Sequence, residues 1–216
     1  MPLADFVRRM IATACKATGL SEHELKARSE ALGCDFDAPP VSREPREVIA
    51  ARGVPEKHLR AIFDREPIEC DALRAVREFL AGDKTSLVLA GGVGTRKSGS
   101  ACWALTQRPG VFVTEDEALR LYTSRLEDDI TSMRRIRAAQ VLVIDDIGEY
   151  SDDKGWSTKV ITGLWNHRYS SELKLIVTVN KTAKQFADEF GQRIVDRVRE
   201  SGRFVELGGQ SVRRTA

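Results

Sequence analysis

Two short stretches of this chain carry residue types that suit the binding of a polyphosphate and a divalent cation. The first follows an apolar run and reads Gly91, Gly92, Val93, Gly94, Thr95, Arg96, Lys97, Ser98. The second is itself an apolar run, Val141 to Ile144, and it ends in Asp145 and Asp146. Glycine-loop amides approach phosphate oxygens closely, lysine neutralises their charge, and serine and aspartate oxygens suit Mg²⁺. The spacing therefore predicts the phosphate and metal halves of one nucleotide site.

The glycine stretch follows the pattern G-x-x-x-x-G-K-S/T except at one position. We expect the glycine amides to face the phosphates, Lys97 to reach the β- and γ-phosphates, and Ser98 to hold the metal at the start of a helix. Arg96 stands where the pattern has its last glycine, so a β-carbon enters a turn that glycine makes without strain. Two alternatives stay open: a degenerate site that binds without hydrolysis, and a plain glycine turn between a strand and a helix.

The acidic pair and one later amide are candidates for the metal and for catalysis. Asp145 is expected to hold Mg²⁺, and Asp146 to orient or deprotonate the attacking water. Asn180 ends a later apolar run, where its amide would position that water. The alternative is that Asp145 and Asp146 form an Asp-rich turn and that Asn180 simply ends its strand.

The elements that must position these residues alternate between strand and helix. Strands are expected at 86–90, 111–114, 141–145, 173–179 and 204–207, and helices at 70–81, 116–138, 157–169 and 183–200. This repeated order predicts an α/β fold, with a parallel five-stranded sheet flanked by helices and joined by right-handed crossovers.

The N-terminal part of the chain is organised differently. Helical spacing is expected from 4 to 19 and from 21 to 32, and a proline-rich segment follows with Pro39, Pro40 and Pro45. Proline cannot continue a helix, so this segment predicts a linker. We therefore expect a small N-terminal helical module over 1–45 and a larger domain over 46–216. The start of a helix-turn-helix is an alternative for the module, although no third helix is apparent.

Composition limits the classes of protein to consider. The 216 residues carry a formal charge of +2, so any affinity for nucleic acid must come from local clusters. The absence of an apolar run long enough for a membrane span argues against membrane insertion. The cysteines are scattered, without a C-x-x-C pair, which favours reduced thiols and a cytoplasmic location. They are Cys15, Cys34, Cys70 and Cys102.

From Arg52 onward the sequence resembles the DnaC/IstB family of AAA+ ATPases, whose members load replicative helicases onto DNA or assist transposases. Beyond the two stretches above, the resemblance lies in Gly191 to Val198 and in Gly209 to Arg213. It implies a P-loop AAA+ domain without a separate lid, with a degenerate Walker A motif and with ATP and Mg²⁺ as cofactors. It also implies that Asn180 is a sensor 1 residue, that Arg193 or Arg197 is an arginine finger for a neighbouring subunit, and that Arg213 resembles sensor 2.

The same resemblance implies a function and partners. It indicates an ATP-dependent DNA-replication accessory protein similar to a helicase loader, which assembles as a homo-oligomer, binds single-stranded DNA and engages a replicative helicase through its N-terminal helices. A transposase-accessory ATPase is one alternative. A non-hydrolysing adaptor that binds DNA or a partner, with its site disabled by Arg96, is the other.

Two groups of arginines have a structural alternative to a functional role. Arg193 and Arg197 could pair with nearby acids such as Asp196 at the surface, where such pairs contribute only tenths of a kcal/mol. The second group comprises Arg120, Arg125, Arg134, Arg135 and Arg137. These arginines would contact DNA phosphates and give salt-sensitive binding to single strands, or would form a solvated face balanced by acids.

Overall fold

The computed structural model describes residues 21, 45–65, 68–149 and 155–208. Residues 43–216 belong to one compact unit. In the described part of this unit, five parallel strands form one sheet in the order β2-β3-β4-β1-β5. They are β1 (Ser86–Ala90), β2 (Gly110–Thr114), β3 (Val141–Asp145), β4 (Lys174–Val179) and β5 (Gly202–Glu206). The predicted α/β class with a parallel five-stranded sheet is confirmed.

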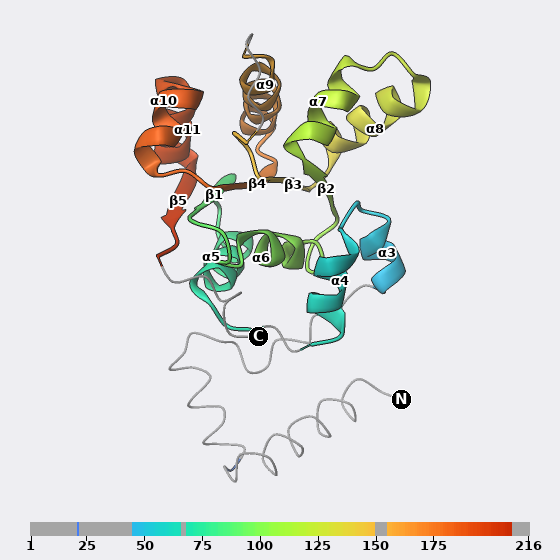
Figure 1. Cartoon of the computed structure of the whole chain (residues 1–216), viewed down its shortest axis with the longest axis vertical. Coiled ribbons are helices and arrows are strands. Elements are labelled where there is room, and N and C mark those ends of the chain that lie inside the picture. Colours follow the sequence, from blue (N-terminus) through green and yellow to red (C-terminus); the bar gives the residue numbers. More distant parts are fainter. Residues whose placement is uncertain (1–20, 22–44, 66–67, 150–154, 209–216) are drawn as a thin grey trace. The chain divides into compact units, whose positions relative to one another are not determined.

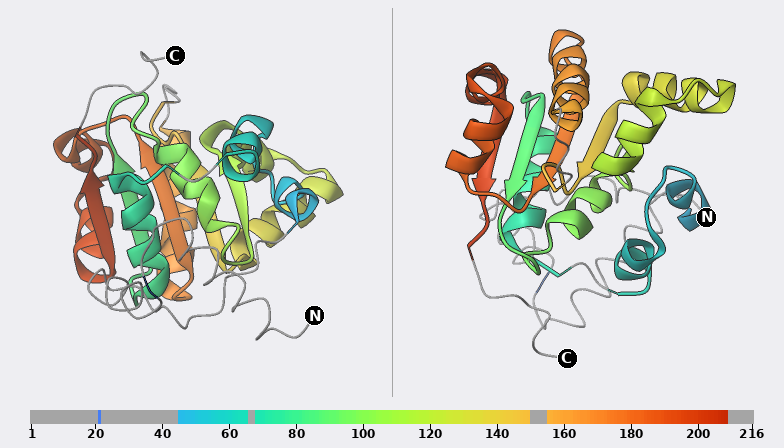
Figure 2. Two further views of the ribbon diagram at one scale, coloured as in Figure 1. Left: turned by 90° about the horizontal axis from the view of Figure 1, so that it is seen from below. Right: turned by 45° about the horizontal axis from the view of Figure 1, so that its top comes forward.

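Helices cover both faces of the sheet (Figure 1). One face carries α3 (Arg46–Ala50), α4 (Glu56–Phe63), α5 (Asp71–Ala81) and α6 (Lys97–Ala104). The other carries α7 (Glu115–Thr123), α8 (Glu127–Ala138), α9 (Trp156–Ser170), α10 (Ala183–Phe190) and α11 (Gln192–Ser201). Two further views show the same three layers, with the α7–α8 pair extending past the β2 edge (Figure 2).

The core consists of two apolar layers because side chains alternate along each strand. In β1, Leu87 and Leu89 pack into the layer beneath α5 and α6. Val88 packs into the opposite layer together with Trp165 of α9 and Phe186 of α10. Every residue of β1 and β3 is buried. This matches the nearly continuous apolar runs that are typical of strands covered on both faces.

The single helix expected at 116–138 is wrong, since α7 and α8 are separate helices. The chain turns at 124–126, where the backbone amide of Leu126 donates to Ser124 Oγ at 3.2 Å. Three acids then fill the first turn of α8, where the helix dipole favours negative charge. This acidic run in the sequence was the available signal for a second helix start.

The single helix expected at 183–200 is also wrong. It is broken at Gly191, which has φ 77° and ψ 166° and separates α10 from α11. Glycine reaches this conformation without the steric penalty of a β-carbon. The break starts a new helix just before Arg193, so the direction of that side chain is set by α11 alone.

Two short helices, α3 and α4, were not expected from the sequence. Pro45 and Pro55 stand immediately before them, and the first turns contain Glu47 and Glu56. Proline fixes a backbone angle suited to a helix start, and acids are favoured in a first turn. The two helices matter because α4 forms part of the cavity described below.

Several predictions concern parts of the chain outside the described residues. The helical module over 1–45 lies there apart from Ser21 and Pro45, and so does Arg213. The division at residue 45 and the sensor 2 assignment therefore stay predictions. Among the helices of the described ranges, none combines the length and apolar character that a bilayer crossing requires.

Candidate nucleotide site

The glycine loop between β1 and α6 keeps a tight turn although Arg96 replaces its last glycine. Arg96 immediately precedes α6 and has φ 64° and ψ 15°, in the left-handed region. This conformation costs a residue with a β-carbon about 1–2 kcal/mol. At the other end of the loop, a β-carbon on Gly91 would lie 2.7 Å from the carbonyl oxygen of Leu207. The loop therefore needs glycine at Gly91 and tolerates strain at Arg96.

Lys97 links the glycine loop to the end of β4. Its side chain is buried, and Nζ donates to the carbonyl oxygens of Gly91 at 2.6 Å and Gly92 at 3.1 Å. The same Nζ donates to Asn180 Oδ1 at 2.7 Å. Two residues that are 83 positions apart in the sequence are thus in direct contact. The structure brings the predicted lysine and the predicted amide into one site.

The two acids after β3 have different surroundings. Asp145 is buried, and its Oδ1 accepts a hydrogen bond from Thr178 Oγ1 at 2.7 Å. The backbone amide of Asp146 donates to the same hydroxyl at 2.8 Å. Sequence analysis did not identify Thr178, and the only signal for it is a polar side chain within a buried apolar strand. Thr178 therefore fixes Asp145 and the backbone of Asp146 together.

The carboxyl of Asp146 borders the cavity and has a raised pKa. It lines the cavity described next, whereas Asp145 does not. Partial desolvation, together with the neighbouring charge of Asp145, raises the pKa of the Asp146 carboxyl, and Lys97 offsets part of this rise. A raised carboxyl pKa in a cleft is a feature of groups that exchange protons.

A cavity of about 540 Å³ adjoins the glycine loop, within the usual size range of small-molecule sites. Its polar wall contains Gly94 to Ser98, Asp146 and Asn180. A second set of lining residues comes from α4, α5 and α6 and from the segment between α4 and α5. They are Lys57, His58, Ala61, Ile62, Ile68, Cys70, Leu73, Gly99, Ser100 and Trp103. The cavity therefore combines donors suited to phosphate with an apolar surface suited to a planar ring.

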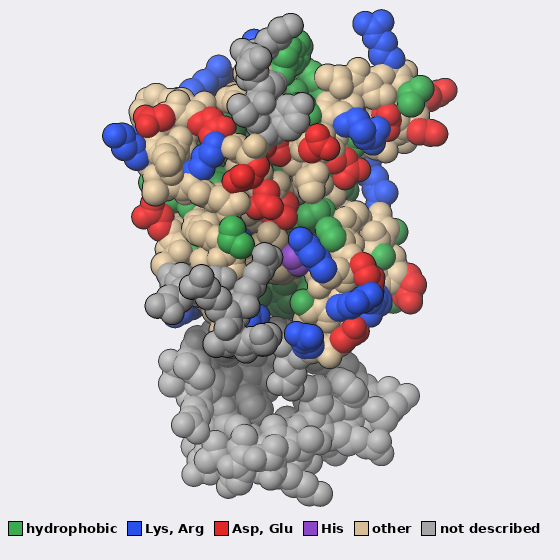
Figure 3. Space-filling view, in the orientation of Figure 1, with side chains coloured by type: hydrophobic (Ala, Val, Ile, Leu, Met, Phe, Trp, Pro, Cys, Tyr) green, Lys and Arg blue, Asp and Glu red, His purple; other side chains and the backbone are tan. Residues whose placement is uncertain are grey.

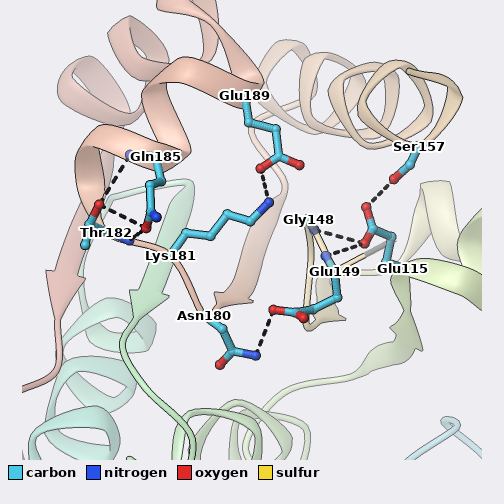
Figure 4. A network of polar contacts seen from close by, with 9 residues as sticks. All are labelled: Glu115, Gly148, Glu149, Ser157, Asn180, Lys181, Thr182, Gln185 and Glu189. Carbon is cyan, nitrogen blue, oxygen red and sulfur yellow. Dashed lines mark hydrogen bonds and ion pairs between the residues drawn. The ribbon is translucent and has the colours of Figure 1, made fainter. Parts of the chain in front are cut away.

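A second network, unexpected from the sequence, anchors the loop after β3 (Figure 4). Glu115 is buried at the start of α7, and its carboxylate accepts the backbone amides of Gly148 at 2.9 Å and Glu149 at 3.1 Å. Ser157 Oγ also donates to this carboxylate. Glu149 in turn accepts a hydrogen bond from Asn180 Nδ2 at 3.0 Å. Asn180 therefore connects this network, which begins at Glu115 of α7, to Lys97 of the glycine loop.

The two candidate finger arginines lie in different surroundings on α11. The guanidinium of Arg197 lies 4.5 Å from the ring centroid of Tyr169, whose hydroxyl donates to Glu200 at 2.6 Å. Arg193 is exposed and has no hydrogen bond or ion pair with the described part of the chain. The alternative in which these arginines pair with Asp196 is not found among the described residues, where Asp196 contacts Gln192 and Arg199. Neither arginine lines the cavity of its own chain.

The candidate DNA-contacting arginines lie on α7, on α8 and, in the case of Arg125, in the segment between them. Arg120 forms an ion pair with Asp129 at 3.1 Å, and Arg135 donates to the carbonyl oxygen of Ala51 at 3.2 Å. Arg125, Arg134 and Arg137 are exposed. The space-filling view shows acidic side chains near the middle of the visible face and most basic side chains nearer its edges (Figure 3). Charges of both signs are therefore present on this face.

Comparisons with known proteins identify the fold. No protein-family model and no curated protein matches the chain. The solved structure of the DnaC helicase loader is similar, with a TM-score of 0.59 and 18% identity over 71% of this chain and 100% of that chain. The structure of DnaI has a TM-score of 0.52 and 20% identity over 78% of this chain and 93% of that one.

A third similar structure is the replication initiator DnaA bound to AMPPCP and single-stranded DNA, with a TM-score of 0.55 and 19% identity. That match covers 73% of this chain and 51% of the DnaA chain. Likeness at these identities is evidence about the fold. The chain therefore has a fold similar to those of DnaC and DnaI, in agreement with the fold that the family resemblance implied.

Proposed function

We propose that this protein binds ATP and Mg²⁺ in the cavity beside the glycine loop and hydrolyses ATP as an accessory factor of DNA replication, similar to a helicase loader. The hydrogen bond between Lys97 and Asn180 carries the proposal. It joins the end of β4 to a loop that keeps its left-handed turn at Arg96. The lysine expected to reach the phosphates and the amide expected to sense the terminal phosphate thus lie in one place, as a single nucleotide site would need.

The donor set fits the proposed ligands. Ser98 is the second residue of α6, and Asp145 ends β3. One or two such protein oxygens suffice for Mg²⁺, which takes its other ligands from phosphate and water. The metal would neutralise charge on the phosphate oxygens. Lys97 would contact the phosphates, and Asp146 and Asn180 would orient the attacking water.

Nucleotide binding followed by turnover tests this proposal. Isothermal titration with AMPPCP and Mg²⁺ should show binding by the natural protein and a loss of at least about tenfold in Lys97→Ala, because a buried cation beside the phosphates is removed. Lys184→Ala is the matched control, since Lys184 is an exposed lysine on α10 that does not line the cavity. Asp146→Asn should then reduce turnover to a small residual rate while binding persists. Equal affinity of the natural protein and Lys97→Ala would refute the nucleotide site.

Arg193 is the better candidate for a finger that acts on a neighbouring subunit. It is exposed, whereas Arg197 packs on Tyr169. A finger supplied in trans makes hydrolysis depend on assembly, and its loss lowers turnover by a factor on the order of 10³ or more. Turnover per subunit should therefore rise with protein concentration, and Arg193→Ala should remove that rise without weakening AMPPCP binding. Arg197→Ala should instead lower the melting temperature.

Single-stranded DNA and a replicative helicase are the proposed partners. The likeness to a helicase loader and to DnaA with bound single-stranded DNA supports this choice. The exposed arginines of α8 would contact phosphates, so the logarithm of DNA affinity should fall linearly with the logarithm of salt concentration. Replacing Arg134 and Arg137 with alanine should reduce that slope by roughly 0.7 per lost contact. A flat salt dependence would remove the proposed role of these arginines.

The helicase assignment needs its own test. The full chain should retain a replicative helicase in a pull-down, and a chain lacking 1–37 should lose it while keeping its AMPPCP affinity. Retention of a transposase in place of the helicase would favour the transposition alternative. Loss of neither partner on truncation would contradict the role proposed for the N-terminal module.

A non-hydrolysing adaptor remains the second candidate because of two observations at the loop. Arg96 has a strained backbone, and Lys97 already donates to protein acceptors. Both features oppose the arrival of a nucleotide. AMPPCP binding without turnover at any protein concentration, or binding gained only in Arg96→Gly, would favour the adaptor.

A further inference from the structure

We propose that Glu149 is a positioning residue that makes the site discriminate nucleoside triphosphates from diphosphates, by holding the Asn180 amide away from a terminal phosphate. This inference rests on the proposed nucleotide function. It goes further because it assigns a role to an acid outside both sequence motifs. In that role Glu149 lowers the affinity of the site for a triphosphate.

The first step is the orientation of the Asn180 amide. Its Oδ1 accepts from Lys97 at 2.7 Å, and its Nδ2 donates to Glu149 at 3.0 Å. An ammonium can only donate and an ionised carboxylate can only accept, so these two neighbours permit a single orientation of the amide. Without Glu149, the Nδ2 group would be available to another acceptor.

The second step is the fixed position of Glu149. Its backbone amide and that of Gly148 are held by the buried carboxylate of Glu115, which also accepts from Ser157 (Figure 4). The loop after β3 is thus attached to the starts of α7 and α9. Glu149 consequently presents its carboxylate to Asn180 from an anchored backbone, although the side chain itself is exposed.

Triphosphates and diphosphates differ in whether a phosphate would reach the Asn180 amide. Oxygens of a terminal phosphate can only accept hydrogen bonds, so they compete for the same donors, Lys97 Nζ and Asn180 Nδ2. In the proposed site, a third phosphate that reaches the Asn180 amide would have to displace Glu149 from it and would lie near the negative charge of Glu149. A diphosphate that ends short of the amide would leave the contact between Asn180 and Glu149 in place. The carboxylate consequently lowers affinity for the triphosphate selectively.

Titration of the full chain with AMPPCP and with ADP, both with Mg²⁺, tests the inference. Glu149→Ala should tighten AMPPCP binding by about three- to tenfold, the range of an ordinary hydrogen bond, because solvent screens the exposed carboxylate. ADP binding should change by less than about twofold. Glu149→Gln keeps an acceptor for Nδ2 and loses the charge, so its effect should be smaller. Asp188→Ala is the control, because Asp188 is an exposed acid of α10 that, like Glu149, does not line the cavity and, unlike Glu149, does not contact the Asn180 amide.

The outcomes separate this inference from the function on which it rests. An equal change in AMPPCP and ADP affinity, or weaker AMPPCP binding in Glu149→Ala, would overturn the role of Glu149 and leave the nucleotide site intact. The same selective gain in Asp188→Ala would also overturn it, because general charge removal would then be the cause. Failure of every variant and of the natural protein to bind either nucleotide would overturn the proposed function, and the inference with it.

Discussion

Replacing Arg96 with glycine removes the β-carbon from a loop residue whose backbone is left-handed, at φ 64° and ψ 15°. Relief of that conformation stabilises the folded chain by about 1–2 kcal/mol. Glycine also gives the unfolded chain more freedom, which offsets about 0.5–1 kcal/mol. The expected net gain is about 0–1.5 kcal/mol, and its midpoint of about 0.75 kcal/mol corresponds to a rise of about 2–3 °C in melting temperature for a domain of this size.

Thermal unfolding followed by circular dichroism measures this change, and Arg96→Ala is the matched control. Alanine also lacks the guanidinium but keeps the β-carbon, so it should give no rise in melting temperature. Because the loop already has the required shape, the two variants should differ little in AMPPCP affinity, and any loss common to both reports the missing charge. A rise of equal size in both variants, or a fall in Arg96→Gly, would refute the assignment of strain to this residue.

Three further predictions concern stability, pH and thiol reactivity. Arg168 is almost completely buried, and burial lowers its pKa to about 10. It donates to carbonyl oxygens at the end of α8 and the start of β4. Arg168→Met should destabilise the protein by about 2–4 kcal/mol in urea unfolding, because those carbonyls lose their donor. A loss below about 0.5 kcal/mol would contradict this role. If Asp146 is the base, turnover should rise as pH increases through its raised pKa, because only the ionised carboxylate accepts a proton. The acidic limb of the pH–rate profile should therefore lie at higher pH than for an ordinary aspartate. If this limb persists in the residual turnover of Asp146→Asn, Asp146 is excluded as its source. Cys70 lines the cavity whereas Cys102 is fully buried and burial raises its thiol pKa, so iodoacetamide should label Cys70 first, and AMPPCP with Mg²⁺ should protect it. Peptide mass spectrometry resolves the two thiols, and unchanged labelling of Cys70 at saturating nucleotide would place the ligand elsewhere.

The sequence predicted most elements because their signals are local. The strands β1 and β3 were predicted with their observed bounds, since each is a short apolar run next to polar or glycine residues. The two helix errors arose where one feature interrupts a long amphipathic pattern, an acidic run in the first turn of α8 and a single glycine before α11. In both cases the helical pattern continues through the break, so periodicity alone does not reveal it.

The sequence by itself determined the fold class, the loop and acid motifs, and the position of Arg96, because these follow from local pattern and spacing. Only the tertiary structure decided that Arg96 adopts a left-handed backbone, that Asn180 bridges Lys97 and Glu149, and that α4 lines the cavity. These contacts join residues that are distant in sequence, such as Lys97 and Asn180. Their geometry depends on which strands lie side by side, and the order β2-β3-β4-β1-β5 places β4 next to β1 although two strands separate them in the chain.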